Sequence, residues 1–308
     1  MHSSDKNLEI WKIALIILTF NQKEKTFDCL NSILQGEFVP NILVWDNGST
    51  DGTAEAIKFE FPDVHVHYSP VNLGVALGRN RAAKLAMDKF NPNMLLFLDN
   101  DMLIEKQFVS ALLKPFHSNK RIGQTQAKLR FMNDKKRLND GGGCKINFIL
   151  GQTKPIGFGE IDLGQHDVVK ECVSCGGAMM VRVDVFNQLG GFDTRFSPFG
   201  PEDLDFSLRL QKAGYKALFV PDAVAYHAVS HTFGEGYSAE YARHKLQHWI
   251  IFLLRHAKLY EKIVFFCISA PILFIKVVGR EALKGNFSAI GGLVKGVLSM
   301  GKTFKDHK

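Results

Sequence analysis

Two aspartates stand two residues apart, directly after an apolar segment, in the motif Asp99-Asn100-Asp101. Carboxylates at the end of a buried strand are costly to desolvate unless a positive charge compensates them. A hard divalent cation, Mg²⁺ or Mn²⁺, would supply that charge, and a diphosphate would complete its shell of oxygen ligands. The motif is also typical of a turn that begins a helix, so the residues alone leave both interpretations open.

A second acidic motif, Asp46-Asn47-Gly48-Ser49, follows another apolar segment and has the same two interpretations. A buried carboxylate at Asp46 would accept a hydrogen bond from the ring N–H of a pyrimidine base. Phe20, at the end of the first apolar segment, would offer a ring on which that base stacks. These residues therefore indicate a nucleoside pocket as the alternative to a turn.

A third polar stretch runs from Asn72 to Asn80. Gly74 and Gly78 would let the backbone approach a ligand closely, because glycine has no side chain. Arg79 would present a planar guanidinium suited to phosphate, although a lone arginine is more often a surface charge. The stretch therefore predicts a contact with a phosphate group.

These motifs depend on the elements that carry them. The first half of the chain alternates short apolar runs with segments of helical periodicity. The runs predict strands at Ile13–Phe20, Ile42–Trp45, Val64–Tyr68 and Met94–Leu98, and the periodic segments predict helices at Thr26–Leu34, Thr53–Phe59, Ala76–Lys89 and Glu105–His117. This alternation predicts an α/β fold with a parallel sheet and helices on both faces. Because ligands bind beyond the carboxyl ends of such strands, the motifs would surround one crevice.

The second half of the chain has a different rhythm. Asn139–Gly164 is rich in glycine and predicts an irregular excursion over the sheet. Ala178–Arg182 predicts a strand, and Glu202–Ala213 predicts a helix. Ala217–Val220 predicts a further strand that ends at Pro221, because proline cannot donate to a strand ladder.

The chain resembles family-2 inverting glycosyltransferases, with the rhamnosyltransferase-like branch as the most similar. The resemblance rests on four motifs in order, Thr19-Phe20-Asn21, Asp46 to Thr53, Asn72 to Asn80 and Asp99-Asn100-Asp101. It covers about residues 10–230 and implies the nucleotide-sugar-binding fold called GT-A, a mostly parallel sheet flanked by helices.

The resemblance implies a role for each matching residue. The donor-binding set would be Thr19, Phe20, Asn21, Asp46, Asn72, Gly74, Arg79, Asp99 and Asn100. Within it, Asp99 would lie by the ribose and Arg79 near the diphosphate. Asp101 would hold the Mg²⁺ or Mn²⁺ that bridges the two phosphates. His227 would join the metal shell as in some relatives, although a single histidine after a strand is often a hydrogen-bonded core residue.

The acceptor side of the resemblance lies in two further segments. Cys175 to Met180 resembles the small-residue segment under the donor sugar, and Phe199 to Arg209 resembles the acidic motif of the acceptor-side helix. An inverting transfer needs a base that deprotonates the acceptor hydroxyl as it attacks the anomeric carbon. We expect Asp203 to be that base, with Glu202 as a neighbour that orients the acceptor or the base. Capping of the helix by these carboxylates is the alternative interpretation.

Composition sets the broad class of the protein. The 308 residues are 46% apolar and 22% charged, which is typical of a globular chain and excludes wholesale disorder. Five cysteines, an odd and small number, favour a reducing compartment. The first 11 residues lack the layout of a secretory signal. We therefore expect a cytoplasmic location.

The formal net charge of +7 belongs to the end of the chain, where residues 241–308 contain 12 Lys/Arg and 3 Asp/Glu. The most apolar part of this tail, Ile263–Ile275, is 13 uncharged residues long, whereas a membrane span needs about 20. Basic amphipathic helices of this kind favour peripheral binding to the anionic inner face of the cell membrane. Packing on a catalytic domain or a partner subunit is the alternative, and the apolar content argues against nucleic acid.

The resemblance implies a GT-A catalytic domain over residues 1–235, with a nucleotide-sugar half at about 10–130 and an acceptor half at about 131–235. The charge and apolar pattern predict a basic helical tail over 236–308. The expected activity is metal-dependent transfer of a sugar from a UDP- or dTDP-linked donor to a lipid-linked or cell-surface glycan. One alternative is a sugar nucleotidyltransferase, which would normally carry a glycine-rich basic loop where this chain has Asn21-Gln22-Lys23-Glu24. The other is a catalytically silent membrane adaptor, which would tend to lose the carboxylates that are present here.

Overall fold

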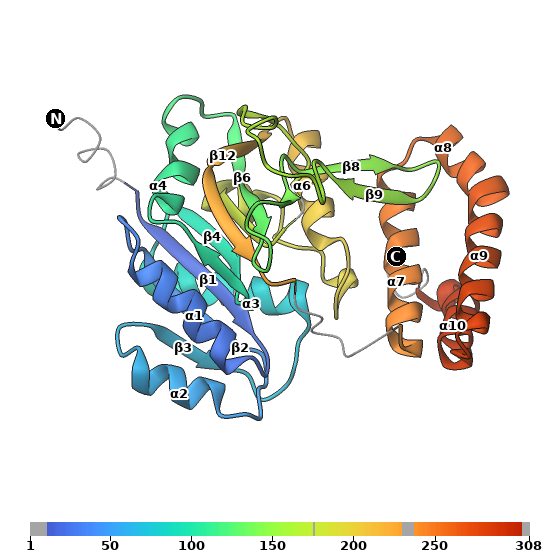
Figure 1. Cartoon of the computed structure of the whole chain (residues 1–308), viewed down its shortest axis with the longest axis horizontal. Helices are drawn as coiled ribbons and strands as arrows, with labels where there is room; N and C mark the ends of the chain where they lie inside the picture. The colour runs from blue at the N-terminus through green and yellow to red at the C-terminus, as the bar shows by residue number, and fades with distance from the viewer. Residues whose placement is uncertain (1–10, 175, 230–236, 304–308) are drawn as a thin grey trace. The chain divides into compact units, whose positions relative to one another are not determined.

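The structure is a computed structural model that describes residues 11–174, 176–229 and 237–303. The chain divides into two compact units (Figure 1). The sheet unit comprises residues 1–145, 155–197 and 202–230, and the helical unit comprises residues 146–154, 198–201 and 231–308. The expected boundary at residues 235 and 236 falls outside the described residues, so that division of the chain stays a prediction.

The sheet unit is built from short strands with helices between them. Its main sheet contains β1 (Ile13–Thr19), β2 (Asn41–Asp46), β3 (His65–Tyr68), β4 (Met94–Asp99), β5 (Met102–Ile104), β6 (Ile122–Phe131), β7 (Leu138–Asp140), β10 (Lys170–Glu171), β11 (Ala178–Arg182) and β12 (Lys216–His227). A separate two-stranded sheet contains β8 (Cys144–Asn147) and β9 (Gln152–Pro155). The helices are α1 (Lys23–Leu34), α2 (Thr53–Glu60), α3 (Val75–Phe90), α4 (Phe108–Leu113), α5 (Val183–Gln188) and α6 (Glu202–Lys212), with 3₁₀ turns η2 (Lys114–His117) and η3 (Thr194–Phe196).

The strand order is β10-β12-β6-β11-β4-β1-β2-β3. The strands β4, β1, β2 and β3 are parallel, as the alternation of strands and helices predicts. β11 is antiparallel to both β4 and β6, whereas β12 is parallel to β6. The sheet is therefore mixed, and the expected α/β fold is confirmed.

Both faces of the sheet are covered by helices (Figure 1). Along β1, Ile13, Leu15 and Ile17 belong to one buried apolar cluster, and Ala14 and Ile16 belong to the other. The first cluster includes residues of α1 and α4, and the second includes residues of α3, α5 and α6. A strand that is apolar on both sides is typical of a sheet between two helical layers, because successive side chains point to opposite faces.

Two expectations for the second half are wrong. The glycine-rich segment Asn139–Gly164 is not wholly irregular, since β7, β8 and β9 lie in or across it. These strands are short and polar, and they lack the apolar alternation by which strands are recognised. β12 does not end at Pro221 but continues to His227, with a shift of register between Val220 and Val224. The proline is tolerated there because a residue at an irregularity need not donate to the ladder.

The helical unit contains α7 (Ala239–His256), α8 (Leu259–Val264), the π-helical segment η4 (Phe265–Ser269), α9 (Ala270–Leu283) and α10 (Phe287–Thr303). α7 and α10 pack through the buried residues Ala242, Ala289 and Leu293. α8, η4 and α9 form one helical run, Leu259–Leu283, of 25 residues with a mean hydropathy of 2.0. This run is long and apolar enough to cross a membrane by length and composition, which the 13-residue uncharged stretch did not suggest.

A buried ion pair connects the segment that follows β9 to strand β6 of the sheet. Lys128 of β6 is 2% exposed, and its ammonium group lies 3.1 Å from Asp162 and also contacts Asp167. Asp162 accepts a second charged contact, at 2.6 Å, from Arg130. Removal of one partner from such a cluster leaves an uncompensated buried charge.

Lys128→Ala should therefore lower the free energy of unfolding by about 3–5 kcal/mol, which urea titration followed by circular dichroism measures. The matched control is Lys84→Ala, which breaks an exposed pair with Asp88 and should cost less than about 0.5 kcal/mol. Equal losses in the two variants would contradict the stabilising role of the buried cluster.

Candidate active site

The carboxyl ends of three parallel strands meet at one edge of the sheet. The register pairs Thr19 at the end of β1 with Asp46 at the end of β2. The residue before Thr19, Leu18, pairs with Asp99 at the end of β4. The three motifs that follow these strands are therefore brought to one edge by backbone pairing, in agreement with the sequence-based expectation.

Asp46 is the last residue of β2 and lies buried at this edge. Its side chain is completely buried, and its Oδ1 accepts a hydrogen bond of 2.7 Å from the backbone N–H of Ser49. Its other oxygen, Oδ2, is buried and has no hydrogen-bond partner among the described residues. A buried acceptor without a partner costs about 1–3 kcal/mol, so a donor from a ligand would be favourable there.

Other predicted donor-site residues hold the loops in place. Asn21 has a left-handed backbone with φ of 50°, and its Oδ1 accepts a 2.7 Å hydrogen bond from Thr50 N–H. Asn100 donates through Nδ2 to the hydroxyl oxygens of Thr19 and Thr26, at 3.2 and 3.1 Å. Phe20, which the resemblance places at the nucleoside, is half-buried. The amides of Asn21 and Asn100 are thus engaged within the protein itself.

Asn72 and Gly74 shape the turn before α3. The Asn72 Oδ1 accepts hydrogen bonds from Gly74 N–H at 2.8 Å and from Asn47 Nδ2 at 2.9 Å. Gly74 has a φ of 74°, a conformation that favours glycine, and α3 begins at the next residue. This turn fixes the direction of the helix that carries Arg79.

Arg79 lies between two carboxylates. It is 6% exposed, and its Nη2 is 2.6 Å from Asp99 Oδ1 while its Nη1 is 3.3 Å from Glu202 Oε1. Burial opposes the charged guanidinium, but the negative charges of Asp99 and Glu202 outweigh it and raise the pKa of Arg79. The sequence placed Arg79 near a diphosphate, whereas the structure engages its guanidinium with the carboxylates on either side of the site.

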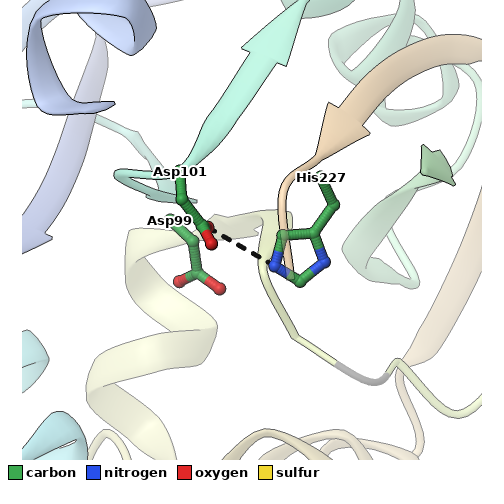
Figure 2. Close-up of side chains that lie close together, drawn as sticks. All are labelled: Asp99, Asp101 and His227. Atoms are coloured by element: carbon green, nitrogen blue, oxygen red, sulfur yellow. Dashed lines mark ion pairs between the residues drawn. The ribbon is translucent and has the colours of Figure 1, made fainter. Parts of the chain in front are cut away.

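Asp99, Asp101 and His227 converge on one point. One ligand atom from each side chain lies within 4.8 Å of the others, and Asp101 Oδ1 is 3.4 Å from His227 Nε2 (Figure 2). Figure 2 shows the Asp101 carboxylate facing the imidazole, with Asp99 beside Asp101. Burial disfavours the imidazolium, but the hydrogen bond and charge of Asp101 outweigh it and raise the pKa of His227. Two carboxylates and an imidazole are ligands that Mn²⁺ accepts, so these residues fit the expected cation.

Backbone pairing sets the spacing of this cluster. β5 begins directly after Asp101 and pairs with β12, so that Met102 lies opposite His227. The backbone N–H of Ala228 also donates to the carbonyl oxygen of Asp101 at 3.0 Å. Asp101 and His227 are therefore held at the same end of one antiparallel ladder. The sequence did not predict β5, because a three-residue strand is too short to show a periodicity.

Sequence reasoning missed Asn139, whose Oδ1 lies 3.1 Å from His227 Nδ1. Asn139 is part of β7, in the segment expected to be an irregular excursion. An asparagine within a polar, glycine-rich stretch reads as a turn residue, and no pattern in the sequence links it to a histidine almost ninety positions later.

Glu202 and Asp203 begin helix α6 at the opposite side of Arg79. Burial and the neighbouring Asp203 raise the pKa of Glu202 in spite of Arg79, and Glu202 Oε2 has no hydrogen-bond partner among the described residues. Burial also raises the pKa of Asp203 to about 6, although a 2.7 Å hydrogen bond from Leu204 N–H opposes that rise. The pair thus combines a buried glutamate, whose pKa is raised to about 8, with a half-buried aspartate, whose pKa is raised to about 6.

Two consecutive glycines separate the acidic groups. Gly176 and Gly177 have φ values of 70° and 77°, and the carbonyl oxygen of Gly177 accepts a 2.8 Å hydrogen bond from Asp99 N–H. A Cβ atom at Gly176 would collide with the carboxylate of Asp203. The small-residue segment expected from the sequence therefore lies against both carboxylates, although its first residue, Cys175, falls outside the described residues.

Two family profiles match this chain. The profile described as glycosyl transferase family 2 matches residues 14–190, and the profile described as the N-terminal domain of galactosyltransferase matches residues 168–232. Among curated proteins, the chain is similar to an N-acetylglucosaminyl-diphospho-decaprenol L-rhamnosyltransferase of Mycobacterium tuberculosis. The two are 27% identical over 237 residues, which cover 70% of this chain and 76% of the relative.

Solved structures share the fold. The chain is similar to GalNAc-T7 in a crystal structure with UDP, GalNAc and Mn²⁺, with a TM-score of 0.64, 16% identity, and coverage of 79% of this chain and 48% of that enzyme. It is also similar to a mannosyltransferase of Pyrobaculum calidifontis in complex with GDP-Man and Mn²⁺, with a TM-score of 0.56, 16% identity, and coverage of 97% and 88%.

The first family match spans more than half of the chain and contains the strand ends that carry Asp46, Asp99 and Asp101. It agrees with the sheet topology and with the solved structures that share the fold. The chain belongs to glycosyl transferase family 2 and is a glycosyltransferase with a GT-A fold.

Proposed function

We propose that this enzyme is a metal-dependent inverting glycosyltransferase that uses a UDP- or dTDP-linked sugar. The observation that carries the proposal is the convergence of Asp99, Asp101 and His227, whose ligand atoms lie within 4.8 Å of one another. Asp203 follows Glu202 at the start of helix α6. Arg79 joins the two groups through its contacts with Asp99 and Glu202. The site thus combines a place for a cation with a carboxylate suited to proton transfer.

The donor binds at the edge where β1, β2 and β4 end. Asp46 Oδ2, buried and without a protein partner, accepts the ring N–H of a uracil or thymine base. This hydrogen bond would satisfy the buried Oδ2 of Asp46, which otherwise destabilises the protein because it has no partner. Asn21, Asn72 and Asn100 act on the donor through the loops that they hold, since their amides bond to other parts of the chain.

Asp99, Asp101 and His227 would hold Mn²⁺ or Mg²⁺. The bound cation would stabilise the negative charge that develops on the departing diphosphate. Two carboxylate oxygens are hard ligands that both cations accept, whereas the imidazole nitrogen favours Mn²⁺ over Mg²⁺. Enzymes that share this fold have been crystallised with Mn²⁺, which supports the same choice.

Asp203 acts as the base that removes the proton from the acceptor hydroxyl. Its raised pKa makes it a better proton acceptor than an ordinary aspartate at neutral pH. Glu202 is more deeply buried and contacts Arg79, so it acts as a positioning residue for the arginine instead of touching the acceptor. The inversion of configuration follows from one direct displacement, which needs no nucleophile from the protein.

The acceptor is a lipid-linked or cell-surface glycan, and the enzyme binds peripherally to the inner face of the cell membrane. The rhamnosyltransferase relative is named for a decaprenol-linked acceptor, which supports a lipid-linked substrate here.

Of the two alternatives from the sequence, the nucleotidyltransferase disagrees with the family match. The silent adaptor predicts no turnover of the donor, which the first experiment below measures.

The helical run Leu259–Leu283 supports membrane binding. Only 11% of its most apolar window is buried within the protein, and Ile272 and Ile275 are 60% and 71% exposed. The 13 uncharged residues between Lys262 and Lys276 extend about 20 Å as a helix, against about 30 Å for a hydrocarbon core. We therefore place the helix along the headgroup layer, with its lysines directed to anionic lipids.

Asp203→Asn should lower the rate of sugar transfer by about 10²–10⁴-fold, because the amide cannot accept the proton. The affinity for UDP with Mn²⁺ should stay within a few fold by calorimetry. Near-wild-type transfer would show that another group is the base, and absence of turnover in the wild-type enzyme with every nucleotide sugar would favour the adaptor.

The same substitution should raise the stability of the metal-free protein. The pKa of Asp203 is higher in the folded state than its ordinary value of 3.8, so the ionised carboxylate opposes folding at neutral pH. Asp203→Asn should therefore raise the Tm at pH 7.5, and the gain should vanish below about pH 4, where both side chains are neutral. A lower Tm at pH 7.5 would contradict the buried-charge argument.

Gly176→Ala should disturb the position of Asp203 without changing its chemistry. The new Cβ would displace the Asp203 carboxylate, and transfer should fall at least about 10-fold while UDP binding persists. Gly190→Ala is the matched control, because Gly190 has a similar φ of 72° and open space around its Cβ position. Equal activity losses in the two variants would mean that backbone strain, not the carboxylate, causes the effect.

Ile272→Glu combined with Ile275→Glu should abolish flotation of the full-length protein with vesicles that contain phosphatidylglycerol. Both side chains are exposed, so the fold should be preserved. Phe59→Glu, an equally drastic change at an 88% exposed position of α2, should leave flotation unchanged. Unchanged flotation of the double variant would contradict the membrane proposal, and resistance to carbonate extraction would show that the helix spans the membrane.

A further inference from the structure

His227 has two different neighbours, one at each ring nitrogen. Its Nε2 faces Asp101 Oδ1 at 3.4 Å, and its Nδ1 faces Asn139 Oδ1 at 3.1 Å. An amide oxygen only accepts hydrogen bonds, so the contact with Asn139 requires the proton on Nδ1. In the neutral ring, Nε2 then keeps its lone pair on the side where Asp101 and Asp99 lie.

We propose that Asn139 is a positioning residue that fixes the tautomer and orientation of His227 so that Nε2 can bind the divalent cation. The proposal rests on the metal site proposed above and adds a residue from outside its ligand set. Histidines that bind metals commonly donate their other ring N–H to a fixed acceptor, and removal of that acceptor typically weakens metal binding.

The backbone around Asn139 explains why its side chain reaches the histidine. β6 pairs with β12 along one side, and Leu129 and Arg130 of β6 pair with β7 along the other. In β7, Asp140 lies opposite Leu129 and Leu138 lies opposite Arg130, which leaves Asn139 as an extra, unpaired residue. Such a bulge redirects a side chain, and bulges are frequent beside active sites.

The residue after Asn139 makes the bulge rigid. The Oδ1 of Asp140 accepts hydrogen bonds from the backbone N–H groups of Gly142 and Gly143, at 2.8 and 2.7 Å. The backbone N–H of Leu138, on the other side, donates to the carbonyl oxygen of Glu160 at 2.9 Å. Because the backbone of Asn139 is already fixed, its side chain loses little conformational entropy when it forms the hydrogen bond with His227. Asn139 is therefore suited to hold the imidazole ring in one orientation.

The neutrality of Asn139 suits this position. Asp99 and Asp101 already bring two negative charges to the site, and a third carboxylate next to His227 would add to their mutual repulsion before a cation binds. An amide supplies the acceptor oxygen without that charge. Asn139 can therefore orient the ring while Asp99 and Asp101 alone provide the negative charge.

The first test measures Mn²⁺ binding to the full-length protein in the presence of UDP by calorimetry. Asn139→Ala should raise the Kd for Mn²⁺ about 10–100-fold, and Asn139→Asp, which keeps an oxygen acceptor, should restore most of the loss. Asn133→Ala, at an exposed position between β6 and β7, is the matched control and should leave the Kd unchanged. An unchanged Kd in Asn139→Ala overturns the inference.

His227→Ala separates this inference from the proposed function. A weaker Kd in His227→Ala with an unchanged Kd in Asn139→Ala overturns only the positioning role. An unchanged Kd in His227→Ala removes the histidine from the metal shell, and with it both that part of the proposed function and the role of Asn139.

The second test observes the wild-type protein directly, and a variant serves only to assign the signal. In ¹⁵N-histidine-labelled wild-type protein with Mg²⁺ and UDP, the neutral ring of His227 should carry its proton on Nδ1, with the signal assigned by its loss in His227→Ala. A proton on Nε2 would mean that the Asn139 amide donates to the ring, which overturns the inference whatever the binding data show.

Discussion

The two buried ion pairs of Arg79 are the interaction on which the rest of the site depends. Without a cation between them, Asp99 and Glu202 would bring negative charge into the same partly buried space, at a large cost in desolvation. The guanidinium is planar and forked, so one side chain can contact both carboxylates at once. The turn at Asn72 and Gly74 precedes α3, the helix that carries this arginine. Arg79 thus connects the cluster that contains Asp99 with the carboxylates at the start of α6.

The sequence predicted the first half of the fold well because parallel strands have a clear signature. β1, β2 and β4 are apolar on both faces and end in polar motifs, and their register was then a consequence of parallel pairing. Asp46, Asp99 and Asp101 could be placed at one edge by this reasoning alone. The contacts of Arg79 with Asp99 and Glu202 could not be predicted, because no local pattern shows that Glu202, far along the chain, lies beside the arginine.

The second half was less predictable for specific reasons. β5 and β7 have three residues each, and a period of two cannot be recognised over so short a length. Pro221 has a strong local preference against the interior of a strand, yet the register shift in β12 accommodates it. Asn139 depends on an antiparallel pairing and a bulge that no local pattern encodes. Local signals therefore brought Asp99 and Asp101 to the same edge of the sheet, whereas long-range pairing determined their neighbours.

The ladder between β5 and β12 has one further consequence. Asp101 and His227 are placed by main-chain hydrogen bonds that any residue other than proline can make, so the scaffold is indifferent to which side chains it presents there. In the proposed metal site, exchange of the imidazole for a carboxylate or an amide would therefore alter the preferred ion without a new fold. Such a backbone frame would let the geometry of the site and its ion selectivity change separately, so that enzymes of this kind could diversify by point substitution.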